Sequence, residues 1–206
     1  MAVMGKPLPT PVRNHLTGLR LLLVFTVLLG LAYPLLMTGI GQGVFHHQAN
    51  GSLVKVEGKV VGSSLLGQNF ELKNGKPDPR WFQPRPSAAG ESGYDGASST
   101  ASNLGPNDPG LTKTVKQRKA EVAAFNGVSQ SQVPPDAVTA SGSGLDPDIS
   151  PQYAAIQVDR VAKARGVDAS KVRALVARYT QGRDAGFLGE PRVDVLELNI
   201  ALQKLS

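Results

Sequence analysis

Metal-ligand chemistry is the first possibility that the residue types raise. His46 and His47 stand side by side, but no cysteine or acidic residue lies at the spacing of a metal site. Asp136, Asp146 and Asp148 could hold a cation through their oxygens, yet the D-x-D-x-D-G pattern of a calcium loop is missing. We therefore expect the histidines to be surface residues and the aspartates to belong to a tight structural turn.

Nucleophilic catalysis has little support in the sequence. Serines are abundant, but none lies in a G-x-S-x-G motif, and no histidine follows His47. The glycine-rich run at residues 141–144 lacks the G-x-x-x-x-G-K-[ST] pattern of a phosphate-binding loop. A hydrolase of the cell envelope would have to use Ser-Lys or carboxylate chemistry, which spacing does not exclude, and Ser141, Asp136 and Asp146 would be its candidate residues. That hydrolase and a tethered solute-binding domain are the alternatives to a non-catalytic subunit.

The element that must position all of these residues is an uncharged stretch at residues 21–40, LLLVFTVLLGLAYPLLMTGI. A helix of this length spans about 30 Å, the hydrocarbon thickness of a bilayer. Three basic residues (Lys6, Arg13 and Arg20) precede it, and the first acidic residue is Glu57. This asymmetry predicts a cytoplasmic N-terminus and an extracytoplasmic remainder. A cleaved signal peptide is the alternative, but its apolar run would have about 7–15 residues and an A-x-A exit, which is absent here.

Two features inside the predicted span could affect its packing. Pro34 lacks a backbone donor, so we expect a kink near Gly30. Gly39 and Gly43 lie four residues apart, which puts two small residues on one helix face and permits close approach of another helix. They are either a contact for a membrane partner or glycines tolerated where the helix leaves the bilayer.

Beyond the span, the sequence indicates one α+β domain with a few short strands and about four helices. The predicted organisation is a cytoplasmic tail at residues 1–18, a transmembrane helix at 19–43 and an extracytoplasmic domain at 44–206. The chain has no cysteine, so disulfides and thiolate chemistry are excluded. Three of the 22 basic residues precede the span and all 16 acidic residues follow it, so the net charge of +6 is partly a topology signal. It is weak support for nucleic-acid binding.

Local patterns predict the individual elements. Strands are expected at residues 52–56 and 59–66, with Glu57 and Gly58 at the turn, and a further strand at 137–140. Helices are expected at residues 111–126, from Ser150 to Gly166, from Asp168 to Gly182, and after Asp194, where Val195, Leu198, Leu202 and Leu205 form an amphipathic repeat.

Two segments allow alternative interpretations. Trp81 and Phe82 are either an exposed binding anchor or, as we expect, the plug of a small core. Residues 88–110 consist mainly of Ala, Gly, Ser, Asn and Pro, which fits either a flexible linker between two lobes or an ordered functional loop.

Five segments together resemble a known family. In order they are GSSLLGQNF (62–70), WFQPRPSAA (81–89), GYDGASSTASNLGPNDP (93–109), VPPDAVTASGSGLDPDIS (133–150) and EPRVDVLELNIAL (190–202). With the preceding anchor, the chain is similar over nearly its whole length to the C subunits of bacterial Kdp potassium-transporting ATPases. Asp194 departs from the asparagine expected in this family, although both residues can cap a helix.

The resemblance implies an accessory, non-catalytic subunit of a high-affinity potassium uptake complex in the cell membrane. Its partners would be a channel-like potassium-binding subunit, a P-type ATPase subunit and a small membrane subunit. Those partners would handle potassium, ATP and magnesium, so this chain would need no cofactor of its own. The family is described as a catalytic chaperone that raises the ATP affinity of the ATPase subunit. Because the predicted topology places the folded part opposite to ATP, this effect would pass through the span or the partners. The resemblance also favours an ordered loop at 88–110.

Polar density without a catalytic pair suggests where the partners are contacted. The candidate contacts are Gly39, Gly43, Gln68, Ser102, Asn103, Asp136, Thr139, Ser141, Gly142, Gly144 and Asp146.

Overall fold

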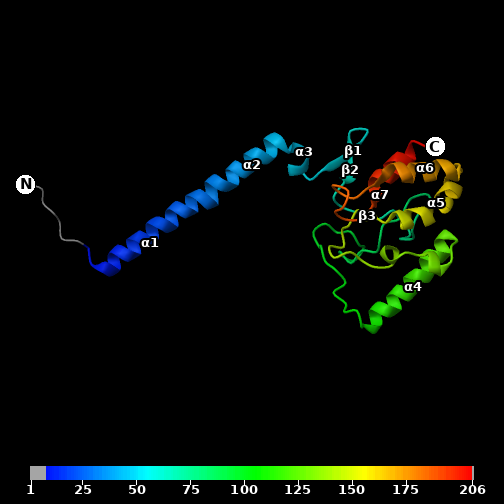
Figure 1. The fold of residues 1–206 in the computed structure, drawn as a ribbon, viewed down its shortest axis with the longest axis horizontal. Helices are drawn as coiled ribbons and strands as arrows, with labels where there is room; N and C mark the ends of the chain where they lie inside the picture. The colour runs from blue at the N-terminus through cyan, green and yellow to red at the C-terminus, as the bar shows by residue number, and fades with distance from the viewer. Residues whose placement is uncertain (1–7, 206) are drawn as a thin grey trace, which may run out of the picture. The chain divides into compact units, whose positions relative to one another are not determined.

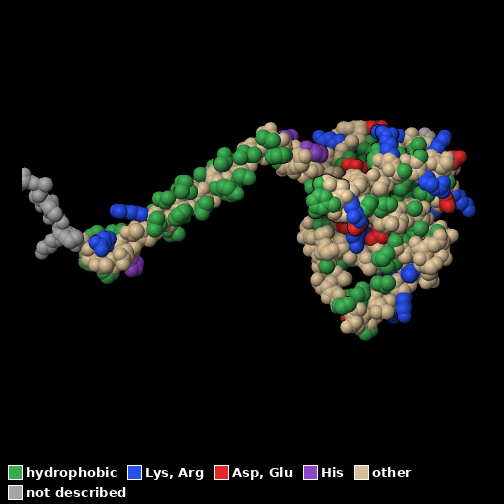
Figure 2. Space-filling view, viewed as in Figure 1, with side chains coloured by type: hydrophobic (Ala, Val, Ile, Leu, Met, Phe, Trp, Pro, Cys, Tyr) green, Lys and Arg blue, Asp and Glu red, His purple; other side chains and the backbone are tan. Residues whose placement is uncertain are grey.

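The structure is a computed structural model that describes residues 8–205, and it divides into two compact units, Met1–Gly51 and Ser52–Ser206. The first unit is helical (Figure 1): α1 (Thr10–Val27), a π-helical segment (Leu28–Ala32), α2 (Tyr33–Val44) and the short α3 (His46–Ala49). Within Thr10–Val44, an 18-residue stretch has a mean hydropathy of 2.3, and the length and composition of this helix suit a membrane span. Figure 2 shows apolar side chains along this helix.

The helix is irregular where we expected a kink near Gly30, because residues Leu28–Ala32 form the π-helical segment. Pro34 has no N–H to donate, and its ring crowds the carbonyl four residues earlier, that of Gly30. The chain responds by a wider turn, in which the Tyr33 N–H bonds the Leu28 carbonyl five residues back. The helix continues beyond Pro34 as α2, so the proline redirects hydrogen bonds without ending the span.

The second unit begins with the predicted hairpin. Strands β1 (Leu53–Val56) and β2 (Lys59–Ser63) pair antiparallel, with Val56 opposite Lys59. Glu57 and Gly58 both have positive φ, 49° and 79°, as a two-residue hairpin turn of this hand requires. The second strand ends at Ser63, earlier than predicted, because Ser63 bridges back to Leu66 in a turn.

A second, three-stranded sheet has the order β3-β5-β4, with both pairs antiparallel. Its strands are β3 (Asp148–Ile149), β4 (Thr180–Gln181) and β5 (Arg192–Asp194), too short for a sequence pattern to reveal. The predicted strand at 137–140 is wrong. Pro134 and Pro135 fix φ and open a 3-10 turn, Pro135–Ala137, so the buried Ala137 and Val138 meet the core from a turn.

The described part of the folded unit has four longer helices: α4 (Pro109–Asn126), α5 (Pro151–Arg165), α6 (Ala169–Tyr179) and α7 (Val195–Gln203). The last three pack on β5 of this sheet, and α4 packs on α5. The predicted N-caps of the last three are confirmed, since Ser150, Asp168 and Asp194 each accept a first-turn backbone N–H. Helix α6 ends at Tyr179, before the predicted Gly182, because the chain enters β4 there. The predicted α+β class is confirmed.

Helix α7 differs from the expected amphipathic helix. It buries side chains around most of its circumference, namely Val195, Leu196, Leu198, Asn199, Ala201 and Leu202. The hairpin explains the second covered face, because a Cβ on Gly62 would lie 2.7 Å from a Leu196 methyl. Helix α7 is therefore a central element of the folded unit.

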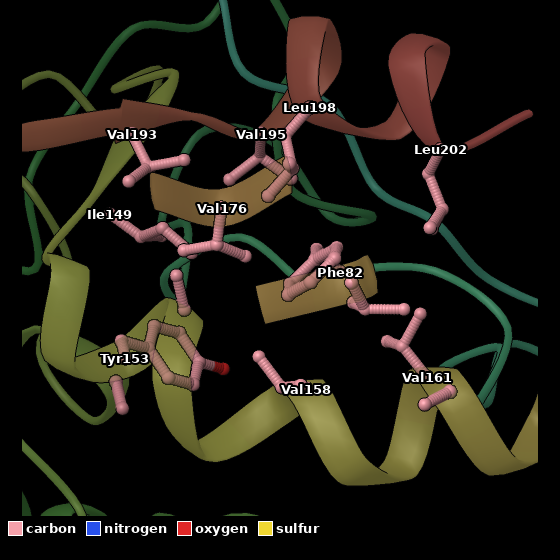
Figure 3. Packing of buried hydrophobic residues seen from close by; sticks show 14 of the residues in the cluster. Phe82, Ile149, Tyr153, Val158, Val161, Val176, Val193, Val195, Leu198 and Leu202 are labelled. Carbon is pink, nitrogen blue, oxygen red and sulfur yellow. The ribbon is translucent and has the colours of Figure 1, made fainter. Parts of the chain in front are cut away.

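The core forms where α5, α6, α7 and β5 meet around Phe82 (Figure 3). Phe82 is fully buried, which confirms its role as a core plug, and the half-buried Trp81 lies beside Phe70 with their ring centroids 6.1 Å apart. Residues 88–110 do not separate two lobes, because Ser52–Ser206 is one unit and Ala89 is fully buried. The linker interpretation is thus wrong and the ordered-loop interpretation holds.

Side-chain amides hold the extended segment that carries Phe82. Asn199 accepts from the Phe82 N–H and donates to the Phe82 carbonyl, both at 2.9 Å. Gln157 likewise accepts from the Gln83 N–H at 2.7 Å and donates to the Gln83 carbonyl at 3.1 Å. These two amides supply the backbone pairing that a neighbouring strand would otherwise give, which is why a buried segment without a strand partner is satisfied.

A buried arginine fixes the same segment from the other side. The Arg160 guanidinium donates to the carbonyls of Pro79 and Trp81, to Asn126 and to Gln157, at 2.6–2.9 Å. Its carbon also lies 4.4 Å from the centroid of the Phe125 ring. Burial lowers the pKa of Arg160 to about 10, so it remains charged at neutral pH.

Candidate functional site

Five of the nine predicted contact residues of the folded unit lie in the loop 139–146, which packs against two other loops. We call these loops the loop cluster: residues 83–89, 93–100 and 139–146, with Gly67 at their edge. An ion pair joins two of these loops, because Arg85 and Asp146 approach to 2.7 Å with side chains 21% and 28% exposed. The same guanidinium donates to the Thr139 carbonyl at 3.4 Å. Arg85 therefore connects both ends of the polar segment 139–146.

Ser87 forms the second connection in the loop cluster. Its hydroxyl donates to the Gly144 carbonyl at 2.6 Å and accepts the N–H groups of Ala89 and Tyr94. The Tyr94 hydroxyl donates to the Arg85 carbonyl at 2.7 Å. Burial raises the pKa of this phenol. One hydroxyl thus connects the neighbouring loops 83–89 and 93–100 with Gly144, which lies 57 residues away in the sequence.

Two glycines permit the close approach of these loops. Gly144 has φ of +68°, and a Cβ there would lie 2.6 Å from the Thr100 carbonyl oxygen and 2.9 Å from the Ala89 nitrogen. A Cβ on Gly67 would lie 2.6 Å from the Asp146 carbonyl oxygen, while the Gly67 N–H donates to the Leu145 carbonyl at 2.9 Å. Any larger residue would separate the backbones at either position.

The segment around residue 100 is hydrogen-bonded to the loop 139–146. The Thr100 N–H and the Ser99 hydroxyl both donate to the Ser143 carbonyl at 3.0 Å. The next residues, Ser102 and Asn103, are exposed, and Asn103 has a φ of +52°. The structure therefore presents the Ser102–Asn103 step on the surface beside a rigid base.

The remaining predicted contacts differ in their surroundings. Asp136 lies apart from the loop cluster and binds the N–H and hydroxyl of Ser150 at 2.7 and 2.9 Å, so its carboxylate supports the start of α5. Gln68 lines a groove of 260 Å³ with Trp81 and Leu196. Gly142 is exposed, with open space where a Cβ would be.

The glycine pair lies in the first unit, on α2. Gly39 and Gly43 both have open space at the Cβ position within that unit. Thr38, beside Gly39, directs its hydroxyl to the Pro34 carbonyl at 2.8 Å and so presents no free donor to a neighbouring helix.

Carboxylates gather where the loop cluster meets the three-stranded sheet. Asp148 faces Asp194 across the β3–β5 pair. Burial and then the nearby Asp146 raise the pKa of Asp148, although Arg192 lies 3.4 Å from its carboxylate. Asp194 is 5% exposed, and burial raises its pKa to about 7 despite the bond from the Glu197 N–H.

A cleft of 720 Å³ adjoins the loop cluster. One wall is formed by Pro84, Arg85 and Ser87, and the other by Arg118, Val122 and Phe125 of α4. Arg118 donates to the Val138 carbonyl at 3.3 Å, and burial lowers its pKa. The acidic and basic residues on its walls balance one another, so charge does not mark the cleft for one class of ligand.

The polar groups of the loop cluster are used to hold its own loops. Asp146 is paired with Arg85, and the Ser141 hydroxyl lies 3.4 Å from that of Ser143. Asp136, outside the loop cluster, is bonded to Ser150. The nucleophile–base arrangement needed for the hydrolase alternative is therefore not formed among Ser141, Asp136 and Asp146. No group of three or more His, Asp or Glu side chains within residues 8–205 is placed to hold a metal ion.

Sequence reasoning missed the residues that organise the cluster, namely Arg85, Ser87, Tyr94 and Gly67. All four lie in segments that resemble the family, 62–70, 81–89 and 93–109, so their positions in those segments were the available signal. The longest of their bonds join positions 57 to 78 residues apart (Ser87 with Gly144, Arg85 with Asp146, and Gly67 with Leu145), and no local pattern connects those positions.

The two units together define a class of protein: a membrane-anchored α+β module with braced, non-catalytic polar loops. Comparison with known families makes this specific. A family model described as "K+-transporting ATPase, c chain" matches residues 15–204. The chain belongs to this family and is a subunit of a potassium-transporting ATPase, though not its catalytic subunit.

Full-length relatives agree with the family match. The chain is 54% identical to a potassium-transporting ATPase KdpC subunit of Kineococcus radiotolerans, over 97% of this chain and 98% of the relative. KdpC subunits of Sorangium cellulosum and Streptomyces coelicolor are 55% and 50% identical, over 90% and 98% of this chain and 94% and 97% of theirs. The resemblance inferred from the sequence segments is thus confirmed.

Proposed function

We propose that this subunit docks from the extracytoplasmic side onto the membrane-embedded subunits of its potassium-transporting ATPase and is needed for their assembly and activity. The supporting observation is the combination of an apolar span with a loop cluster whose arginine is paired with Asp146 and whose other carboxylate, Asp95, accepts hydrogen bonds from its own loop. Such a surface suits a fixed protein contact better than a mobile catalytic or ligand-binding site. The partners are a channel-like potassium-binding subunit, a P-type ATPase subunit and a small membrane subunit.

In this proposal the chain crosses the cell membrane once, with its N-terminus in the cytoplasm. The support is the position of Arg13 and Arg20 before the apolar residues. Because the chain lacks cysteine, a single Ser102→Cys change gives a unique label on the exposed loop, and Thr10→Cys gives one at the start of α1. A membrane-impermeant maleimide should label Ser102→Cys in intact cells or spheroplasts and Thr10→Cys only after lysis. The reverse pattern would overturn the proposed orientation.

The proposal includes an effect on ATP use without direct ATP contact. Potassium, ATP and magnesium are handled by the partner subunits, and this chain raises the ATP affinity of the ATPase subunit through the span or through the partners. The glycine pair Gly39/Gly43 is the proposed contact by which α2 meets a partner helix. The measurement is the ATP dependence of potassium-stimulated hydrolysis by complexes with and without this chain.

Two results would separate the parts of this proposal. If the complex without the chain assembles and pumps normally, the accessory role is wrong. If activity falls but the KM for ATP is unchanged, the chain acts on assembly or ion access and the ATP effect is wrong. A set of variants carrying Ser102→Ala with Asn103→Ala, or Thr139→Ala with Asp146→Asn, should weaken co-purification if the loop cluster makes the contact.

A further inference from the structure

An exposed apolar tip lies between β4 and β5, outside the loop cluster. Residues 181–190 are all exposed, and within them Phe187 and Leu188 leave 72% and 53% of their surface in solvent. Phe187 is the most exposed large apolar side chain of the described residues. We call residues 184–188 the apolar tip.

The backbone holds the apolar tip in one shape. Asp184 and Leu188 exchange two hydrogen bonds, each 2.9 Å, which close a narrow hairpin. Ala185 and Gly186 reverse the chain with φ of +51° and +83°. A left-handed alanine is uncommon and costs on the order of 1 kcal/mol. The exposed phenyl ring therefore stands on a pre-formed support, which lowers the entropy cost of any contact it makes.

Ion pairs neutralise the base of the apolar tip. Arg183 approaches Glu190 to 2.8 Å, and Arg192 approaches Asp184 to 3.7 Å. Loops that enter the surface of an anionic bilayer carry unpaired lysine or arginine beside their apolar residues. Here each cation has a carboxylate partner, so the surroundings of Phe187 favour a protein surface over lipid.

We propose that the apolar tip inserts Phe187 into an apolar socket on another subunit of the same ATPase. This inference rests on the proposed function, which places the folded unit against membrane-embedded partners. An exposed aromatic side chain on a fixed backbone turn is suited to serve as a buried anchor of a protein interface. The contact is independent of the loop cluster, since none of its residues belongs to that cluster.

The test uses the whole complex. Subunits purified from cells lacking this chain are titrated with the full-length chain in detergent, and both co-elution and potassium-stimulated ATP hydrolysis are measured. Phe187→Ala should raise the half-saturating concentration roughly 10- to 100-fold, the range for removing one buried phenyl ring. Leu72→Ala is the matched control, because Leu72 is 39% exposed on another tight turn, closed by its bond to Lys76. The control should titrate like the wild-type chain.

The outcomes distinguish this inference from the proposed function. If the wild-type chain binds and restores activity but Phe187→Ala does so equally well, the socket is wrong and the proposed function stands. If the wild-type chain neither binds nor restores activity, both fail.

Two other surfaces that could cover Phe187, the lipid bilayer and a second copy of this chain, would give distinct signals. A Phe187→Trp chain in nanodiscs without other subunits should not be quenched by brominated lipid beyond the Trp81 background. Quenching would assign the tip to the bilayer, and loss of a homo-oligomer on Phe187→Ala would assign it to a second copy. Either result overturns the proposal.

Discussion

Replacing Asp194 by asparagine should make the folded unit more stable at neutral and alkaline pH. The Asp194 carboxylate caps α7 by accepting the Glu197 N–H at 2.7 Å, a bond that an asparagine oxygen can also accept. Burial dominates its environment and raises its pKa to about 7 from the ordinary 3.8. The facing Asp148 and the nearby Glu197 add to this shift through repulsion. The native protein therefore carries a carboxyl group that resists ionisation.

The sign of the pH dependence follows from proton counting. Between pH of about 4 and 7 the native state binds more protons at Asp194 than the unfolded state does, so the free energy of unfolding falls as pH rises. The shift corresponds to about 4 kcal/mol at ~1.4 kcal/mol per pKa unit, lost over this window and constant above it. Asp194→Asn removes the titration. Its stability advantage over the wild type should thus grow by a few kcal/mol from pH 4 to pH 8.

Urea unfolding of the full-length chain in detergent, followed by fluorescence, measures this difference. Trp81 is the only tryptophan and packs on Phe70 and Arg165, so its emission reports on the folded unit. Asp159→Asn is the matched control, because that carboxylate is 80% exposed. A difference between Asp194→Asn and wild type that does not change with pH would refute the reasoning, as would a wild type that gains stability above pH 7.

Three further changes test the scaffold by the same urea measurement. Gly144→Ala should lower the free energy of unfolding by about 2–4 kcal/mol, because its Cβ would lie 2.6 Å from the Thr100 carbonyl oxygen and because residue 144 has a left-handed φ. Gly142→Ala is the control and should be nearly neutral, since a Cβ at residue 142 meets open space. Asn199→Leu should lower the free energy of unfolding by about 2–4 kcal/mol, because the N–H and the carbonyl of Phe82 both lose their hydrogen-bond partner. A loss below about 1 kcal/mol would contradict the importance of these two bonds. Asp146→Asn should cost about 1 kcal/mol at pH 7 by removing the partly buried pair with Arg85, and high salt should shrink the difference.

Local patterns predicted the elements whose causes are local. The caps of α5, α6 and α7 each depend on one short polar residue beside an apolar run, and the first hairpin depends on Glu57 and Gly58. The place of the irregularity before Pro34 follows from that proline, although its π-helical form was not predicted. These features were predictable because the responsible residues lie within a few positions of the structure they produce.

The three-stranded sheet and the loop cluster were not predictable in this way. Strands of two or three residues show no periodicity, and their pairing depends on partners 46 and 13 positions apart, as for Asp148 with Asp194 and Thr180 with Val193. Ala137 and Val138 reach the core from a 3-10 turn that two prolines impose. Their apolar character therefore reflects burial from a turn and not a β-strand. For the candidate site, composition indicated polar loops, but only the fold shows that Arg85 and Ser87 hold them together.

The bonds between Phe82 and Asn199 have a consequence for biogenesis. They join positions 117 residues apart, and the bond between Gln83 and Gln157 joins positions 74 residues apart. A chain made from its N-terminus therefore delivers its span to the membrane long before the core can close around Phe82. Until α7 emerges, the segment after the span has apolar surface and unpaired backbone groups at its centre. The proposed docking through the folded unit is thus a late step, and any association during synthesis must begin with the span.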